Sequence, residues 1–185
     1  MLIHIPRLYS KDEFVNFCSK IPKDYDVKSE EFWGYVEEKL KPYLTRACIN
    51  RIYLESLDKK GDEGIGLAKE IIDSRGFKII KLLIDKGGKL HATEDTNLIQ
   101  ETSSWLALLG DNPNLNIMIE MYQESLSERD SYIAKVIDQT LKDNEIGVII
   151  IEPTHRLSLP EDIKVIKMCR FDPSDYLKSF LHNKI

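Results

Sequence analysis

The chain has 185 residues, of which 42% are hydrophobic and 31% are charged, and its formal net charge is −5. This composition is ordinary for a soluble globular protein and argues against wholesale disorder, and the length suits one domain that spans residues 1–185. The acidic balance comes without a clustered basic face. We therefore expect no nucleic-acid partner, because nothing offers an electrostatic footprint for a phosphate backbone.

Targeting signals and cysteines indicate the cell compartment. The stretch MLIHIPRLYSKDEF has too short an apolar run for a signal peptide, and no run reaches the roughly 18 residues that suggest a membrane span. Cys18, Cys48 and Cys169 are odd in number, widely spaced and without a CxxC pair, which disfavours disulfides and thiolate zinc. We expect reduced, structural cysteines, a cytoplasmic location and no membrane partner.

The first strand is predicted at residues 2–5 and is stopped by Pro6. Ser10 is the expected N-cap of a helix whose apolar residues recur at helical spacing, and a second helix is expected from near Ser29. NRIYLESL, residues 50–57, predicts the second strand.

The middle of the chain alternates helices and a strand. Residues 64–84 read as helical with a break near Gly76, and residues 87–94 predict a short third strand. A helix over residues 96–109, a break at residues 110–114 and a long helix to about Lys142 follow.

The C-terminal part contains the clearest strand signal. GVIIIE, residues 147–152, has four β-branched residues in a row, which is typical of a central strand buried on both faces. Residues 164–168 predict a fifth strand, and a closing helix is expected over residues 172–181, with Asp172 as its N-cap. Strands separated by helices predict an α/β fold, with a mostly parallel sheet of about five strands and helices on both faces.

Polar residues follow the predicted strands, where ligands gather in such sheets. They are Arg7 and Tyr9 after the first strand, Glu55 in the second, Glu94 and Asp95 after the third, and Glu152 and His155 after the fourth. A histidine near carboxylates suits a general base, so His155 is the candidate base and Glu55 the residue that orients it or activates water.

A second chemistry uses the same region of the sequence. Glu94, Asp95 and Glu152 could instead hold a divalent metal ion that activates water. Each of these residues could instead have a purely structural role. Glu94 and Asp95 also suit the first turn of a helix, and His155 also suits a loop.

Arg129 is a further candidate. It lies one turn before Ile133 on the helix face that is expected to cover the sheet, where it could bind a carboxylate or phosphate group. The alternative is an ion pair with Glu55 or Glu94. Asp130 is expected near the N-terminus of the helix, and we expect His4, His91 and His182 to be structural.

Three segments of the chain carry a family resemblance. RDSYIAKVIDQTLKDNEIGVIIIEPTHRL resembles the closing portion of the TraB/ChaN/erythromycin-esterase-like superfamily, in which a helix with arginine at its start leads to an apolar strand and a Gly-Ala-x-His turn. RIYLESL resembles the superfamily's strand that ends in glutamate, and ATEDTNLIQE an acidic segment of small bacterial and archaeal relatives.

The resemblance implies an α/β fold with Glu55, Arg129 and His155 as site positions, and an activity like that of the esterases or metal-dependent proteases of the group. Two departures stand out. The first strand leads to Tyr9 where the family has a histidine, and Glu152 occupies the glycine position of the final turn, followed by Pro153.

Two functional hypotheses follow. The first is a hydrolase that acts on a small-molecule or peptide substrate, with His155 as base, Glu55 beside it and Arg129 on an anionic group. The second is an inactive relative that serves as a binding or interaction module, with a protein partner or a homo-oligomer as its expected assembly.

Overall fold

The computed structural model describes residues 1–46, 48–109 and 115–182. The predicted break at residues 110–114 lies outside the described residues, as do the side chains of Cys18 and His182. The elements, in chain order, are β1 (Leu2–Pro6), α1 (Lys11–Cys18), α2 (Tyr25–Thr45), β2 (Ile49–Leu54), α3 (Gly61–Ile71), α4 (Ser74–Asp85), β3 (Lys89–His91), α5 (Thr96–Leu109), α6 (Leu115–Thr140), β4 (Ile146–Ile151), β5 (Val165–Lys167) and α7 (Pro173–His182).

The five strands form one sheet in the order β3-β2-β4-β1-β5, and every neighbouring pair is parallel. The α/β fold with a parallel sheet is therefore confirmed. β4 lies at the centre between β1 and β2, as its unbroken apolar run predicts, and Val148 to Ile151 are buried. All strands consequently end at the same edge of the sheet, which we call the carboxyl edge.

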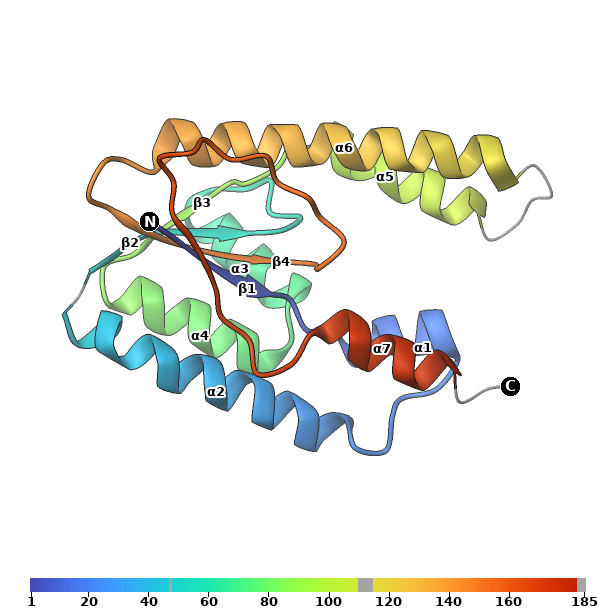
Figure 1. The fold of residues 1–185 in the computed structure, drawn as a ribbon, viewed down its shortest axis with the longest axis horizontal. Helices are drawn as coiled ribbons and strands as arrows, with labels where there is room; N and C mark the ends of the chain where they lie inside the picture. The colour runs from blue at the N-terminus through green and yellow to red at the C-terminus, as the bar shows by residue number, and fades with distance from the viewer. Residues whose placement is uncertain (47, 110–114, 183–185) are drawn as a thin grey trace.

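Helices cover the two faces of the sheet unequally (Figure 1). α2 and α4 pack together on one face, where residues such as Phe32, Val36 and Ile80 meet the strands in the largest core cluster. The other face is covered by α6, whose residues Ile133 and Ile137, with Leu141 directly after the helix, meet β-strand residues in a second cluster. The predicted helical stripes are thus the surfaces that bury the sheet.

Two helices begin at residues whose side chains cap the helix N-terminus. Ser10 caps α1 in a complete capping box with Glu13, and Asp172 accepts a hydrogen bond from the Ser174 N–H at 2.9 Å, both as predicted. α2 begins at Tyr25, earlier than expected, so that Ser29 lies buried inside the helix.

The expected break near Gly76 is wrong, because Gly76 lies inside α4. The chain breaks instead at Asp73, whose carboxylate accepts hydrogen bonds from the Arg75 and Gly76 N–H groups at 2.8 Å. Gly76 is a packing residue, since a Cβ there would lie 2.5 Å from Ile72 Cδ1 and 2.8 Å from Trp33 Cζ2.

Two helix pairs extend past the carboxyl edge (Figure 1). α6 has 26 residues and is about 39 Å long, whereas the six-residue strands β2 and β4 span about 20 Å. α6 therefore projects beyond the sheet together with α5, which packs along it. α1 and α7 also contact each other and lie across from this pair. No helix within the described ranges is long and apolar enough to cross a membrane.

Candidate active site at the carboxyl edge of the sheet

Arg7 is the first residue beyond β1, and its guanidinium group holds three carboxylates. Its Nε donates to Glu55 Oε2 at 3.3 Å, and its two terminal nitrogens donate to Glu13 at 3.0 and 2.7 Å. Nη2 also donates to Glu152. The Arg7 side chain is only 8% exposed, so one buried cation joins acids from three different elements.

Glu13 is a member of this cluster that the sequence analysis missed. It comes from the first turn of α1, where the capping box with Ser10 fixes its side chain. The signal was present, since a capping-box glutamate just after a strand end stands close to the residue that leaves that strand.

Glu55 is the most enclosed carboxylate of the site. Its Oε1 lies 3.2 Å from His155 Nε2, and its Oε2 accepts the Glu152 N–H at 2.7 Å. Burial alone would raise its pKa. The Arg7 charge and the His155 hydrogen bond outweigh burial and lower the pKa of Glu55 to about 2, so this group is ionised at neutral pH.

His155 bonds carboxylates through both ring nitrogens. Nδ1 lies 2.5 Å from Asp130 Oδ1, Nε2 faces Glu55, and the side chain is 1% exposed. Burial disfavours the imidazolium, but the bonds to Asp130 and Glu55 raise the pKa of His155 to about 9. The ring is therefore positively charged at neutral pH and holds the loop after β4 to α6.

Asp130 does not lie near a helix N-terminus, and that expectation is wrong. It lies well inside α6, and its second oxygen accepts the Arg156 N–H at 2.8 Å. The long helix that the sequence analysis predicted, from the break at residues 110–114 to about Lys142, already places Asp130 in a helix interior, and that prediction is confirmed.

Arg129 forms an ion pair with Glu94. Its Nε and Nη2 both donate to that carboxylate, the latter at 2.9 Å to Oε1, and Nη2 also lies 3.7 Å from Glu55 Oε1. Ser56 completes the arrangement, since its N–H donates to Glu94 Oε1 at 2.6 Å. Ser56 has φ 61°, a conformation that is uncommon outside glycine and that clusters at functional sites.

The metal interpretation does not fit these positions. Asp95 stays outside the cluster and caps α5, accepting the Asn97 N–H at 2.8 Å. The Glu94 carboxylate is turned to Arg129, and that of Glu152 to Arg7. Within the described residues, no three His, Cys, Asp or Glu side chains are grouped so that they could hold a metal ion.

Glu152 differs from the other carboxylates at Arg7. Its side chain is 20% exposed, and the hydroxyl of Thr154 donates to its Oε2 at 3.3 Å. Burial and the neighbouring Glu55 charge raise the pKa of Glu152 to about 7, so both protonation states are populated at neutral pH.

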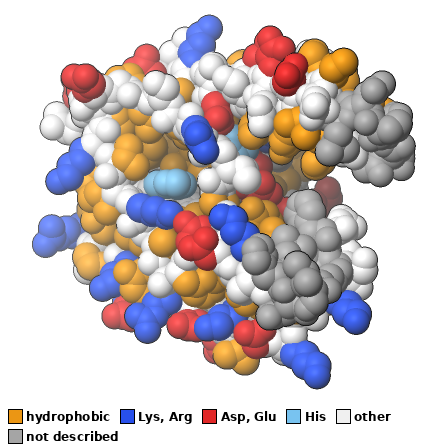
Figure 2. All heavy atoms as spheres, turned by 45° about the vertical axis from the view of Figure 1, so that its right-hand side comes forward, with side chains coloured by type: hydrophobic (Ala, Val, Ile, Leu, Met, Phe, Trp, Pro, Cys, Tyr) orange, Lys and Arg blue, Asp and Glu red, His pale blue; other side chains and the backbone are white. Residues whose placement is uncertain are grey.

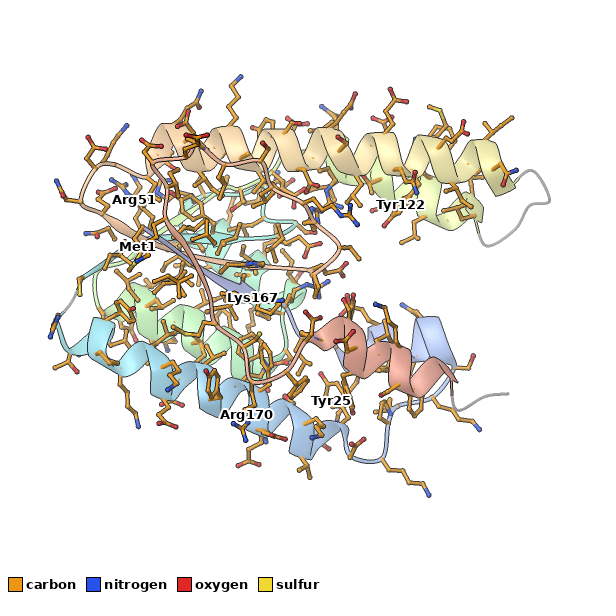
Figure 3. The ribbon with its side chains drawn as sticks, viewed as in Figure 1. Met1, Tyr25, Arg51, Tyr122, Lys167 and Arg170 are labelled. Atoms are coloured by element: carbon orange, nitrogen blue, oxygen red, sulfur yellow. The ribbon has the colours of Figure 1, made fainter. Side chains whose placement is uncertain are left out.

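Two tyrosines lie close enough to Glu152 to respond to its charge. Burial and then the Glu152 charge raise the pKa of Tyr9 to about 12, and they raise that of Tyr122 as well. Tyr122 extends from α6 above the carboxyl edge (Figure 3). Both phenols are therefore neutral at neutral pH, but Tyr9 is 4% exposed and packs its ring against Phe14, whereas Tyr122 is half-buried.

The surface is hollowed on this side of the molecule (Figure 2). Acidic and hydrophobic side chains are visible in the hollow, which opens between the two projecting helix pairs. A separate cavity of about 270 Å³ adjoins His155 on the α6 face, and apolar residues such as Leu2, Ile149 and Leu159 line most of it. The loop that carries Glu152 and His155 thus has a charged side and an apolar side.

The chain matches no family model, no curated protein and no solved structure. The resemblance to the TraB/ChaN/erythromycin-esterase-like superfamily therefore stays a prediction. The three positions that it implies, Glu55, Arg129 and His155, lie in one network of ion pairs, with Glu55 in contact with the other two.

Proposed function

We propose that the protein is a hydrolase in which Glu152 exchanges the proton of the reaction. The observation that supports this best is that Glu55 and Glu152 share one guanidinium group in contrasting surroundings, with the Glu55 side chain 6% exposed and the Glu152 side chain 20% exposed. Paired carboxyl groups whose environments separate their pKa values are a recurrent basis for acid–base catalysis.

The proposal gives the other charged residues supporting roles. His155 already bonds two carboxylates and carries a proton at neutral pH, so it is a positioning residue for Glu55 in place of the expected base. Arg129 is occupied by Glu94 and serves the same purpose. The function of these residues is to keep Glu55 ionised next to Glu152.

Glu152 can act in either direction of proton transfer. In its acid form it protonates a leaving group, and in its ionised form it accepts a proton from water that attacks the substrate. Its pKa of about 7 keeps both forms available at neutral pH. The neutral hydroxyl of the half-buried Tyr122 can donate a hydrogen bond to a substrate held beside Glu152.

The experiment is a screen of the purified protein against chromogenic esters, amides, phosphates and glycosides, followed by Glu152→Gln. We expect turnover with a pH dependence centred near 7, and a loss of about 10²–10⁴-fold in kcat in the variant. Glu145→Gln removes an ion-paired glutamate at the other end of the sheet and should leave turnover unchanged.

Two results would count against this function. One is turnover by the wild type that survives in folded Glu152→Gln. The other is no turnover of any compound class by folded wild-type protein over the pH range 5–9.

A second candidate is the non-catalytic binding module. It is favoured by hydrophobic side chains that stand exposed on the projecting pair α5–α6, with Leu106 47% and Ile117 65% exposed. Sedimentation of the wild type and of Ile117→Lys tests this function. A homo-oligomer that the variant dissociates, in a protein without turnover, would favour it.

A further inference from the structure

We infer that the bond cleaved at this site is glycosidic and that the substrate is a neutral sugar derivative. This inference rests on the proposed function and adds to it the class of substrate. It follows from the sign of the charge around Glu152, from the way in which each cation of the site is used, and from the groups beside the acid.

Negative charge exceeds positive charge in the cluster. Among the described residues that it joins, five carboxyl groups face three cations, so the net charge is −2 with Glu152 ionised and −1 with Glu152 protonated. The carboxyl groups belong to Glu13, Glu55, Glu94, Asp130 and Glu152, and the cations are Arg7, Arg129 and His155.

Each cation is already shared between carboxylates. Arg7 contacts three of them, Arg129 contacts Glu94 and Glu55, and His155 contacts Glu55 and Asp130. A phosphate or carboxylate on a substrate would therefore have to displace a buried ion pair. This arrangement disfavours the expected role of Arg129 as a clamp for an anionic group.

The sign of the charge discriminates between classes of hydrolysis. Ester and amide hydrolysis develops an oxyanion, and phosphoryl transfer places charge on phosphate oxygens, so both require cations or N–H donors at the reacting centre. Glycoside hydrolysis passes through a transition state that resembles an oxocarbenium ion and carries positive charge. A site with surplus negative charge stabilises the latter and destabilises the former.

The two carboxyl groups match the needs of that reaction. The Glu152 carboxylic acid gives its proton to the leaving atom while the bond to the sugar C1 breaks, and the bonding electron pair goes to that atom. A water oxygen then bonds to C1, and its proton returns to the Glu152 carboxylate. Glu55 remains ionised throughout and stabilises the positive charge, without forming a covalent bond.

The walls of the site also suit a sugar. Tyr122 is a half-buried aromatic residue whose neutral hydroxyl is close enough to respond to the Glu152 charge, and Ser56 and Thr154 add hydroxyl groups at the edge of the cluster. Aromatic faces pack against sugar C–H groups, and polar groups orient the sugar hydroxyls.

The first test measures binding without turnover. The probes are two protonated iminosugars, 1-deoxynojirimycin and 1,4-dideoxy-1,4-imino-D-ribitol, each compared with the neutral sugar that has oxygen in place of the ring nitrogen. We expect one iminosugar to bind at least about tenfold more tightly than its neutral counterpart, because the charged ring imitates the transition state. Glu152→Gln should abolish the difference, and Glu145→Gln should leave it intact.

The second test compares bond classes with one leaving group. p-Nitrophenol is attached to hexoses and pentoses, to acetate and butyrate, and to phosphate, and nucleosides form a separate arm that distinguishes N-glycosides from O-glycosides. We expect Glu152-dependent turnover of glycosides alone.

The outcomes separate the two proposals. Glu152-dependent turnover of an ester or phosphate without turnover of a glycoside overturns the glycosidic inference and leaves the hydrolase standing. Iminosugars that bind no better than their neutral counterparts, or inorganic phosphate that competes with them for the site, also overturn the inference. Absence of turnover in every arm together with absence of iminosugar binding overturns both.

Discussion

Arginine–glutamate pairs lie at both ends of the parallel sheet. At the amino ends of the strands, Arg51 donates to Glu145 through two nitrogens, at 2.8 and 2.6 Å. At the carboxyl edge, Arg129 holds Glu94 in the same two-pronged manner. Arg51 and Tyr122 lie on opposite sides of the molecule and indicate the two ends (Figure 3).

The surroundings of the two pairs differ. Arg51 and Glu145 are 20% and 21% exposed, and the pKa of Glu145 is lowered to about 2 by the Arg51 hydrogen bond. Arg129 and Glu94 are 8% and 1% exposed, and they connect through Glu55 to Arg7 and His155. A bidentate ion pair is therefore not by itself a sign of function. The feature that distinguishes the carboxyl edge is a buried surplus of acid with one member near neutrality.

The largest expected effect concerns stability. Glu55→Ala leaves Arg7 and His155 buried without their common partner, and should lower the free energy of unfolding by about 3–5 kcal/mol. Glu145→Ala breaks a more exposed pair and should cost about 1 kcal/mol. Urea unfolding at pH 7 measures both. Equal losses of unfolding free energy in Glu55→Ala and Glu145→Ala would show that the two ends of the sheet do not differ in this respect.

The second effect concerns pH. Because the pKa of Glu152 is raised to about 7, the folded state keeps a proton that the unfolded state releases near 4.5, and stability falls as pH rises between these values. We expect a loss on the order of 3 kcal/mol from this group. Glu152→Gln should remove this fall, since glutamine never ionises.

At the amino ends of the strands, Glu145 makes stability depend on pH in the opposite direction. The depressed pKa of Glu145 contributes stability that is present above about 4.5 and is lost as pH falls towards 2. Glu145→Gln should therefore make the acid limb of the stability curve shallower, with the contribution of Glu55 remaining, and leave the neutral limb unchanged. A fall between about pH 4.5 and 6.5 that persists in Glu152→Gln would contradict the assignment of the raised pKa, because the fall that His155 contributes begins only above about pH 6.5.

A third prediction uses the two histidines that accompany the pairs. His155 should stay protonated to about pH 9, because Asp130 and Glu55 flank it, whereas burial and the Arg51 charge lower the pKa of His91 to about 4. The imidazole signals in an NMR titration report both values. Asp130→Asn should lower the pKa of His155 and leave His91 unmoved, and a His155 that titrates near 6.5 would refute the doubly bonded arrangement.

The smallest effect concerns Asp95, the acid next to Glu94. It caps α5, and Asp95→Ala should cost about 1 kcal/mol of stability while the titration of His155 and any turnover stay unchanged. Thermal unfolding and the same NMR titration test this. A change in His155 would place Asp95 in the cluster after all.

Much of the fold could be predicted because its signals are local or periodic. The β-branched run Val148–Ile151 indicated a central strand, and the stripe Ile133, Ile137 and Leu141 indicated the helix face that covers the sheet. Ser10 and Asp172 marked helix starts by their capping chemistry. The break near Gly76 was misplaced because a glycine needed for close packing and a glycine that ends a helix look alike in sequence.

The site was predictable in part. Parallel strands end at one edge, so the polar residues after them were expected together, and Glu55, Glu94, Glu152 and His155 do meet there. Which acid faces which cation was not predictable. Arg7 was noted without a role, Glu13 was missed, and Asp95 was included although it caps a helix, because sequence order carries no information on side-chain direction in a loop.

The sequence by itself determined the alternation of strands and helices, the central strand and the edge at which charged groups collect, since these depend on hydrophobic period and on capping over short distances. Only the tertiary structure decided the protonation of those groups. A pKa depends on burial and on charges brought within a few ångströms from distant parts of the chain. Arg7, Glu55 and Glu152 are far apart in sequence, and the pKa of Glu152 is raised only when β1, β2 and β4 lie side by side.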